Sequence, residues 1–155
     1  MHPLKSSFQL NCIHTTVVDA RKDGHHTEYA IRVYFNISGK QKVVYRRFSA
    51  FLQLQLLAQR QFQDGTYCCG GERNCLLTQF LEPLFDYTEF PKLQGALFGK
   101  NSKLVVRDRL HFLNSFLIHL EEAICKIPPG IITRCENEGC KMTKLIKSFY
   151  GHVDL

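Results

Sequence analysis

The hydrophobic pattern changes its period once along the chain, from the alternation of strands to the wider spacing of helices. Residues 8–19 are rich in β-branched types, and in residues 27–38 apolar side chains alternate with polar ones. Turn-forming sequences at 21–24 and 38–40 separate these segments from each other and from a third apolar run at 42–48. The pattern therefore predicts three strands joined by short turns, which is typical of an antiparallel meander.

The rest of the chain has helical spacing. Ser49 is a suitable N-cap for the first helix, because its hydroxyl can accept a hydrogen bond from the backbone. The apolar positions predict helices over 50–62, 76–85 (interrupted at Pro83), 103–124 and 142–150. Three strands followed by three to four helices indicate an α+β fold. We expect residues 1–155 to form a single domain, since this length suffices for one core.

Charge is distributed unevenly along the chain. Residues 1–62 hold nine Lys/Arg against three Asp/Glu, residues 63–90 hold one against five, and residues 91–155 hold ten against six. We interpret residues 63–90 as an atypical acidic insert that contains cysteine and glycine. The two basic blocks suit an anionic partner, either a membrane surface or a nucleic acid.

The composition also limits where the protein acts. Residues 1–7 lack the apolar core of a signal peptide, and no run approaches the roughly 18 apolar residues that span a bilayer. We therefore expect a cytoplasmic protein, with any membrane contact peripheral and with its seven cysteines reduced.

The cysteines and histidines do not indicate a metal site or an enzyme. Neither Cys68, Cys69 and Cys75 nor the pair Cys135 and Cys140 forms a C-x-x-C motif, and no histidine has finger-like spacing. We expect no metal ion and no cofactor. Cys12 and Cys125 lie in apolar stretches and are expected in the core, and His25 and His26 in a turn. No catalytic pairing or phosphate loop stands out, so we expect no enzymatic activity.

The end of the third strand carries the most informative chemistry. Alternation sends Arg46 and Arg47 to opposite faces, so one of them can point into a groove. A guanidinium held there by the backbone suits a phosphate group, and Phe48 offers a flat ring for a sugar-like ring. The alternative is a solvated strand end followed by a core phenylalanine.

Together with two later motifs, this segment resembles the phox-homology (PX) domain, the phosphoinositide-binding module of sorting nexins and related trafficking proteins. The resemblance covers residues 8–150 and rests on three motifs: Tyr-Arg-Arg-Phe-Ser-Ala-Phe at 45–51, Phe-Pro-Lys at 90–92, and Arg109 followed by Leu113, Phe116 and Leu117.

The resemblance implies a binding site for the head group of phosphatidylinositol 3-phosphate. Arg47 matches the arginine that holds the 3-phosphate, and Phe48 matches the aromatic residue under the inositol ring. Lys92 matches the lysine that meets the 1-phosphate, and Arg109 matches the arginine that binds the ring hydroxyls. Arg107, two residues away, is expected to be surface charge.

The resemblance also implies attachment to endosomal or other 3-phosphoinositide-rich membranes. Leu97 and Phe98 fall where the family carries its membrane-inserting loop. Burying two such side chains could add about 1.5–3 kcal/mol each. The alternative is that either residue fills the core of the domain.

Three classes of function follow from these observations. The first is a lipid-binding adaptor for 3-phosphoinositide membranes. The second is a protein-interaction module on the same fold, with a vestigial pocket and with the insert at 63–90 as the working surface. The third, nucleic-acid binding, is not expected, because the exposed paired aromatics that stack bases on a sheet are missing.

Overall fold

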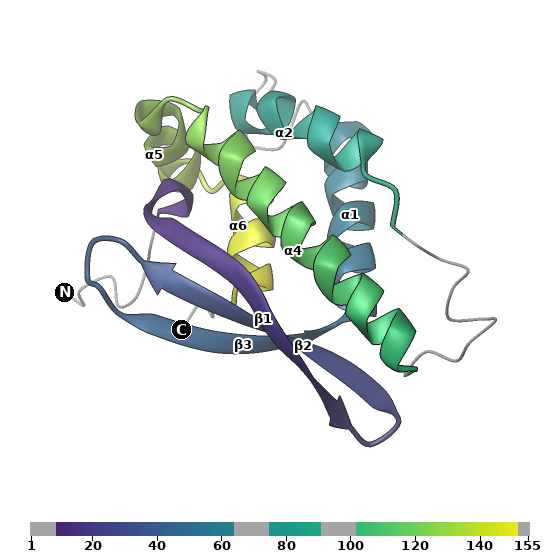
Figure 1. Cartoon of the computed structure of the whole chain (residues 1–155). Helices are drawn as coiled ribbons and strands as arrows, with labels where there is room; N and C mark the ends of the chain where they lie inside the picture. Colours follow the sequence, from purple (N-terminus) through teal and green to yellow (C-terminus); the bar gives the residue numbers. More distant parts are fainter. Residues whose placement is uncertain (1–8, 64–74, 91–101, 152–155) are drawn as a thin grey trace.

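A three-stranded antiparallel sheet forms one side of the molecule (Figure 1). The computed structural model describes residues 9–63, 75–90 and 102–151. A 3-10 turn, η1 (Leu10–Cys12), leads into the strands β1 (Ile13–Asp23), β2 (His26–Phe35) and β3 (Gln41–Arg47), which lie in the order β1-β2-β3. The predicted meander is therefore confirmed.

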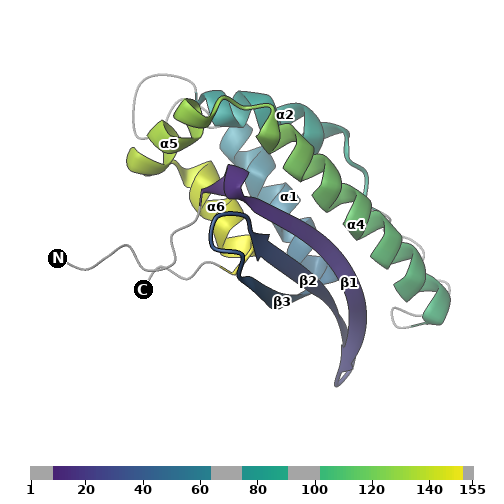
Figure 2. The same cartoon turned by 60° about the vertical axis from the view of Figure 1, so that its left-hand side comes forward.

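The described helices lie on the other side of the molecule and cover one face of the sheet (Figures 1 and 2). They are α1 (Phe48–Gln63), α2 (Leu76–Tyr87), α4 (Lys103–Cys125), α5 (Pro129–Asn137) and α6 (Lys141–Phe149). The α+β fold is confirmed, but these five helices exceed the three to four expected. The additional helix, α5, begins with Pro129 in its first turn, where a missing N–H costs no intrahelical hydrogen bond.

Several element boundaries differ from those expected. The first strand continues to Asp23, and the turn follows at Gly24, whose positive φ of 61° favours glycine. Phe48 starts α1 instead of ending β3, so Ser49 lies inside the helix and not at its N-cap. Pro83 lies within α2 without ending it.

Part of the expected acidic insert belongs to the core. Leu77, Leu81 and Phe85 on α2 are fully buried, and the Phe85 ring packs against Phe116 of α4 with centroids 5.9 Å apart. Residues 76–87 therefore form a helix whose apolar side packs into the core. Residues 64–74 lie outside the described part of the chain.

Polar side chains of α4 fix that helix along the free edge of β1. Asn114 Oδ1 accepts a hydrogen bond from the Val17 N–H at 3.1 Å, and Glu121 Oε1 accepts one from the Thr15 N–H at 2.9 Å. These groups satisfy edge N–H groups that would otherwise be open to pairing with another strand. They also set the position of Arg109, which lies five residues before Asn114.

Two cations of β3 bind the C-terminal end of α6. Arg46 donates from Nε to the Phe149 carbonyl at 2.9 Å and from Nη2 to the Ser148 carbonyl at 3.4 Å. Lys42 Nζ donates to the Gly151 carbonyl at 3.1 Å, and burial, followed by the charge of Arg46, lowers the pKa of Lys42. Carbonyls at the end of a helix lack intrahelical partners, so these contacts satisfy them and fasten α6 to the sheet.

Within the described residues, no helix combines the length and the apolar composition needed to cross a membrane.

Candidate functional site

The two adjacent arginines of β3 point to different places, as alternation requires. Arg46 binds the end of α6, whereas Arg47 is exposed and lies opposite Glu28 of β2 in the strand register. Glu28 instead pairs with Arg21, at 3.1 Å between Nη2 and Oε1. In the described part of the chain, Arg47 has no side-chain hydrogen bond or ion pair, so its guanidinium is available to a ligand.

Arg47, Phe48 and Arg109 line one cavity of about 270 Å³. It lies between the ends of the strands and α4, and its other lining residues are His25, His26, Thr27, Ser49 and Leu52. Two guanidinium and two imidazole groups therefore surround one hollow. None of the described residues that line it is acidic, so the cavity is suited to an anion.

Arg109 is held in this cavity by an aromatic ring. Its guanidinium carbon lies 4.0 Å from the centroid of the Phe48 ring, a cation–π contact. Arg109 Nε is buried and has no hydrogen-bond acceptor among the described residues. A buried donor without an acceptor is costly, and a phosphate or hydroxyl oxygen that entered the cavity could accept this hydrogen bond.

Tyr29 lies fully buried close to Arg109. Burial raises the pKa of Tyr29, and the positive charge of Arg109 partly opposes this shift. By geometry, the Tyr29 hydroxyl makes no hydrogen bond within the described residues. The neutral phenol therefore does not compensate the charge of Arg109 at neutral pH.

Phe48 is more enclosed than the sequence suggests. Only 7% of its surface is exposed, because Arg109 lies over the ring and Phe90 packs on it with centroids 6.0 Å apart. A ligand that reaches this cavity therefore meets the guanidinium of Arg109 before it meets the ring.

Three of the expected site residues lie outside the described residues: Lys92, Leu97 and Phe98. The chain before them is anchored beside the cavity. Phe90, two positions before Lys92, is buried against Phe112 at 4.9 Å and Phe116 at 5.3 Å between ring centroids.

His25 and His26 are cavity residues that the sequence analysis assigned only to a turn. The predicted meander contained one signal for them, because its first turn and the end of its third strand lie at the same end of the sheet. Asp23 pairs with His26 across the hairpin, so the turn has two central residues, and this register places both histidines at the end of the sheet that also holds Arg47.

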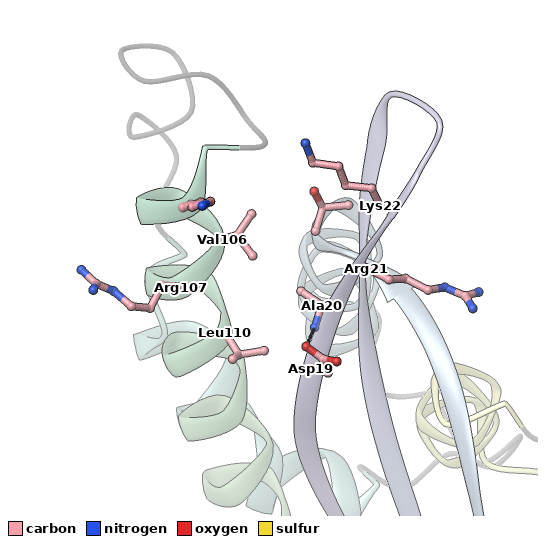
Figure 3. Close-up of a pocket in the computed structure, with 9 residues that line it drawn as sticks. Asp19, Ala20, Arg21, Lys22, Val106, Arg107 and Leu110 are labelled. Atoms are coloured by element: carbon pink, nitrogen blue, oxygen red, sulfur yellow. Dashed lines mark hydrogen bonds between the residues drawn. The ribbon is translucent and has the colours of Figure 1, made fainter.

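A second cavity, of about 350 Å³, lies between the β1–β2 hairpin and the first turns of α4 (Figure 3). Val106 and Leu110 point toward the hairpin, while Arg107 points away from it. Arg21 points to the far side, where its guanidinium lies 3.4 Å from the centroid of the Tyr45 ring. Asp19 lines this cavity together with Lys22 and Lys103, so it is less suited to an anion than the first cavity, which has no acidic residue among its described lining. Arg107 is exposed, as expected.

The cysteines are arranged differently from the sequence expectation. Cys75, Cys135 and Cys140, which belong to two separate groups in the sequence, are buried together. Cys125 is exposed instead of lying in the core, and Cys12 is half-buried.

In comparisons with known proteins, no family model matches the chain and no curated protein is significantly similar to it.

Proposed function

We propose that this protein binds the phosphorylated inositol head group of phosphatidylinositol 3-phosphate in the cavity of Arg47, Phe48 and Arg109, and so attaches peripherally to membranes. The observation that carries the proposal is the convergence of two guanidinium groups, from positions 47 and 109, on one hollow without acidic lining residues among those described. The sequence resemblance to PX domains supports the same ligand.

The two arginines have different roles in the proposed complex. Arg47 is exposed and uncommitted within the described residues, so its planar fork can form two parallel hydrogen bonds with the 3-phosphate. Arg109 is half-buried and stacked on Phe48, and its buried Nε can donate to a ring hydroxyl. His25 and His26 also line this cavity.

The proposed function includes endosomal attachment, with Lys92 on the 1-phosphate and with Leu97 and Phe98 at the membrane interface. Lys92 follows Phe90 by two positions, and Phe90 packs against Phe48 of the cavity. Basic residues near an anionic leaflet contribute about 1 kcal/mol each, which would add to the binding of the head group.

Sedimentation with liposomes tests this proposal. Liposomes that contain phosphatidylinositol, its 3-phosphate, its 4-phosphate or its 4,5-bisphosphate are mixed with wild type, Arg47→Ala and Arg107→Ala. Arg107→Ala is the matched control, because it removes the same charge from an exposed position that points away from the hairpin. A charge-assisted hydrogen bond contributes about 1.5–3 kcal/mol, so Arg47→Ala should weaken binding about tenfold or more.

We expect wild type and Arg107→Ala to sediment with the 3-phosphate liposomes and Arg47→Ala to remain in solution. Equal binding of all three proteins to every anionic liposome would contradict a specific pocket. Failure of the wild type to bind any liposome would overturn the lipid proposal. It would favour the protein-interaction module, for which Arg47→Ala leaves cellular localisation unchanged.

A further inference from the structure

Three buried cysteines meet at the end of the helical layer farthest from the β1–β2 hairpin. Cys75 Sγ lies 3.6 Å from Cys140 Sγ and 4.0 Å from Cys135 Sγ, and all three sulfur atoms lie within 4.8 Å of one another. The side chains are exposed by 3% or less. α5 and the last residues of α4 lie at this end, whereas α4 begins beside the hairpin (Figure 1).

The backbone at the end of α5 brings two of these cysteines together. The Cys140 N–H donates to the Cys135 carbonyl at 2.9 Å, and the Gly139 N–H donates to the Glu136 carbonyl at 3.3 Å. With Gly139 at a φ of 72°, this pair of hydrogen bonds is a Schellman motif, which turns the chain back over the last helical turn. Cys135 and Cys140 therefore face the same point, and the four residues between them match the spacing of paired zinc ligands.

Two helix N-termini are directed at the same cluster. Cys75 is the N-cap of α2 and Cys140 is the N-cap of α6. The positive end of a helix dipole stabilises an anionic sulfur and thus favours the thiolate, which is the form that binds metals.

The separations of the sulfur atoms fit ligands around one ion. Zinc–sulfur bonds of about 2.3 Å in a tetrahedral arrangement place neighbouring sulfur atoms about 3.8 Å apart. The two separations given above lie close to this value. A disulfide needs about 2.05 Å between its sulfur atoms, so no two of the three residues are at bonding distance in this arrangement.

We propose that Cys75, Cys135 and Cys140 bind a structural zinc ion as thiolates. Each thiol releases its proton to solvent when the sulfur coordinates the metal. The ion ties the start of α2 to the end of α5 and the start of α6, three elements that are far apart in the sequence. Structural zinc takes four ligands, of which the described residues supply these three.

The metal content of the purified protein tests this proposal. The chain is purified without chelators from zinc-supplemented medium, and zinc is measured by inductively coupled plasma mass spectrometry. We expect about one zinc ion per wild-type chain and less than about a tenth of that in Cys135→Ser and in Cys140→Ser. Cys125→Ser is the matched control, because Cys125 is exposed at the end of α4. This variant should keep its zinc.

A second measurement uses the wild type alone, since serine in the core can unfold the domain without any involvement of metal. Thermal melts are recorded before and after a strong zinc chelator is added, and again after Zn²⁺ is restored. We expect the chelator to lower the melting temperature and Zn²⁺ to restore it. Cobalt substitution then counts the thiolates that bind the metal by their charge-transfer absorption.

Three results would overturn the proposal. The first is a wild type that contains no metal and melts unchanged in the chelator, in which case the three cysteines are apolar core residues. The second is a mass lower by two hydrogens, with a disulfide mapped to any two of the three. The third is zinc that remains in Cys135→Ser and Cys140→Ser, which would place the ion elsewhere.

Discussion

At the scale of single residues, the candidate site depends on the difference between two guanidinium groups. Arg47 is exposed, whereas Arg109 is held over the Phe48 ring at 4.0 Å with its Nε buried. Holding a side chain in place before the ligand arrives lowers the entropy lost on binding. Arg109 should therefore contribute to head-group binding through the fixed, planar shape of its guanidinium as well as through its charge.

Replacement of Arg109 by lysine tests this contribution of shape. Lysine keeps the positive charge but lacks the planar fork and the Nε donor. We expect Arg109→Lys to weaken binding of the 3-phosphate head group about tenfold, an effect of about 1.4 kcal/mol, in isothermal titration calorimetry. Equal affinities of Arg109→Lys and wild type would show that only the charge matters.

At the scale of elements, β3 serves two separate purposes on its two faces. Arg46 donates hydrogen bonds to the last carbonyls of α6, and Arg47 lines the cavity. Gly151 lies in the same contact, because a Cβ built on it would come within 2.7 Å of Val44. One face of β3 therefore binds the end of α6 and stabilises the fold, while the other face carries the proposed site.

Alanine at each of the adjacent arginines should separate these purposes. Arg46→Ala leaves the Phe149 carbonyl without its donor and removes one of two donors from the Ser148 carbonyl, which keeps the Gly151 N–H, so we expect the free energy of unfolding to fall by about 2 kcal/mol. Head-group affinity should stay near the wild-type value. Arg47→Ala should have the reverse effect, with unchanged stability and lost binding. Urea titrations and calorimetry on both variants measure the two quantities, and a common loss of both properties in both variants would contradict the division.

The sequence predicts elements better than it predicts sites. Alternation over 27–38 was sufficient to identify β2, and the leucine spacing was sufficient to identify α4, because each pattern depends on local periodicity. α5 was missed: no helix was predicted between 124 and 142, although Pro129 in the first turn of α5 is compatible with the start of a helix. The proline at 83 suggested an interruption, but packing of α2 in the core keeps that helix continuous.

Sites depend on contacts between distant segments, which local patterns do not contain. The sequence placed Arg47, Phe48 and Arg109 through a resemblance, and the structure brings these three around one cavity. The sequence contained no indication that Cys75 lies beside Cys135 and Cys140, because that contact requires the turn after α5 and the packing of α2.

At the scale of the whole molecule, buried tyrosines make the stability of the fold depend on pH. Tyr150 is buried, and burial raises its pKa above the ordinary value of about 10; Thr15 partly opposes this rise, and the charge of Glu121 adds to it. Burial also raises the pKa of Tyr29. A phenol whose pKa is higher in the folded state contributes stability below pH 10 that is lost as the pH rises toward the folded value.

We therefore expect the stability of the wild type to fall above pH 10, with a contribution from Tyr150 of about 1.4 kcal/mol at pH 11. Tyr150→Phe should lose less stability than the wild type between pH 8 and pH 11. Tyr87→Phe, at an exposed position, should lose as much as the wild type. Urea unfolding at both pH values measures the differences, and identical losses in all three proteins would exclude Tyr150 as a cause.

The most direct test of the proposed site is an NMR titration of the arginine Nε–H groups with soluble inositol 1,3-bisphosphate, which carries the phosphates of the lipid without its acyl chains. The resonances are assigned with single arginine variants. We predict that the Arg47 and Arg109 signals shift together and saturate at one equivalent, while the Arg107 signal stays in place. Shifts that do not saturate, or that affect Arg107 as much as Arg109, would contradict a common head-group pocket.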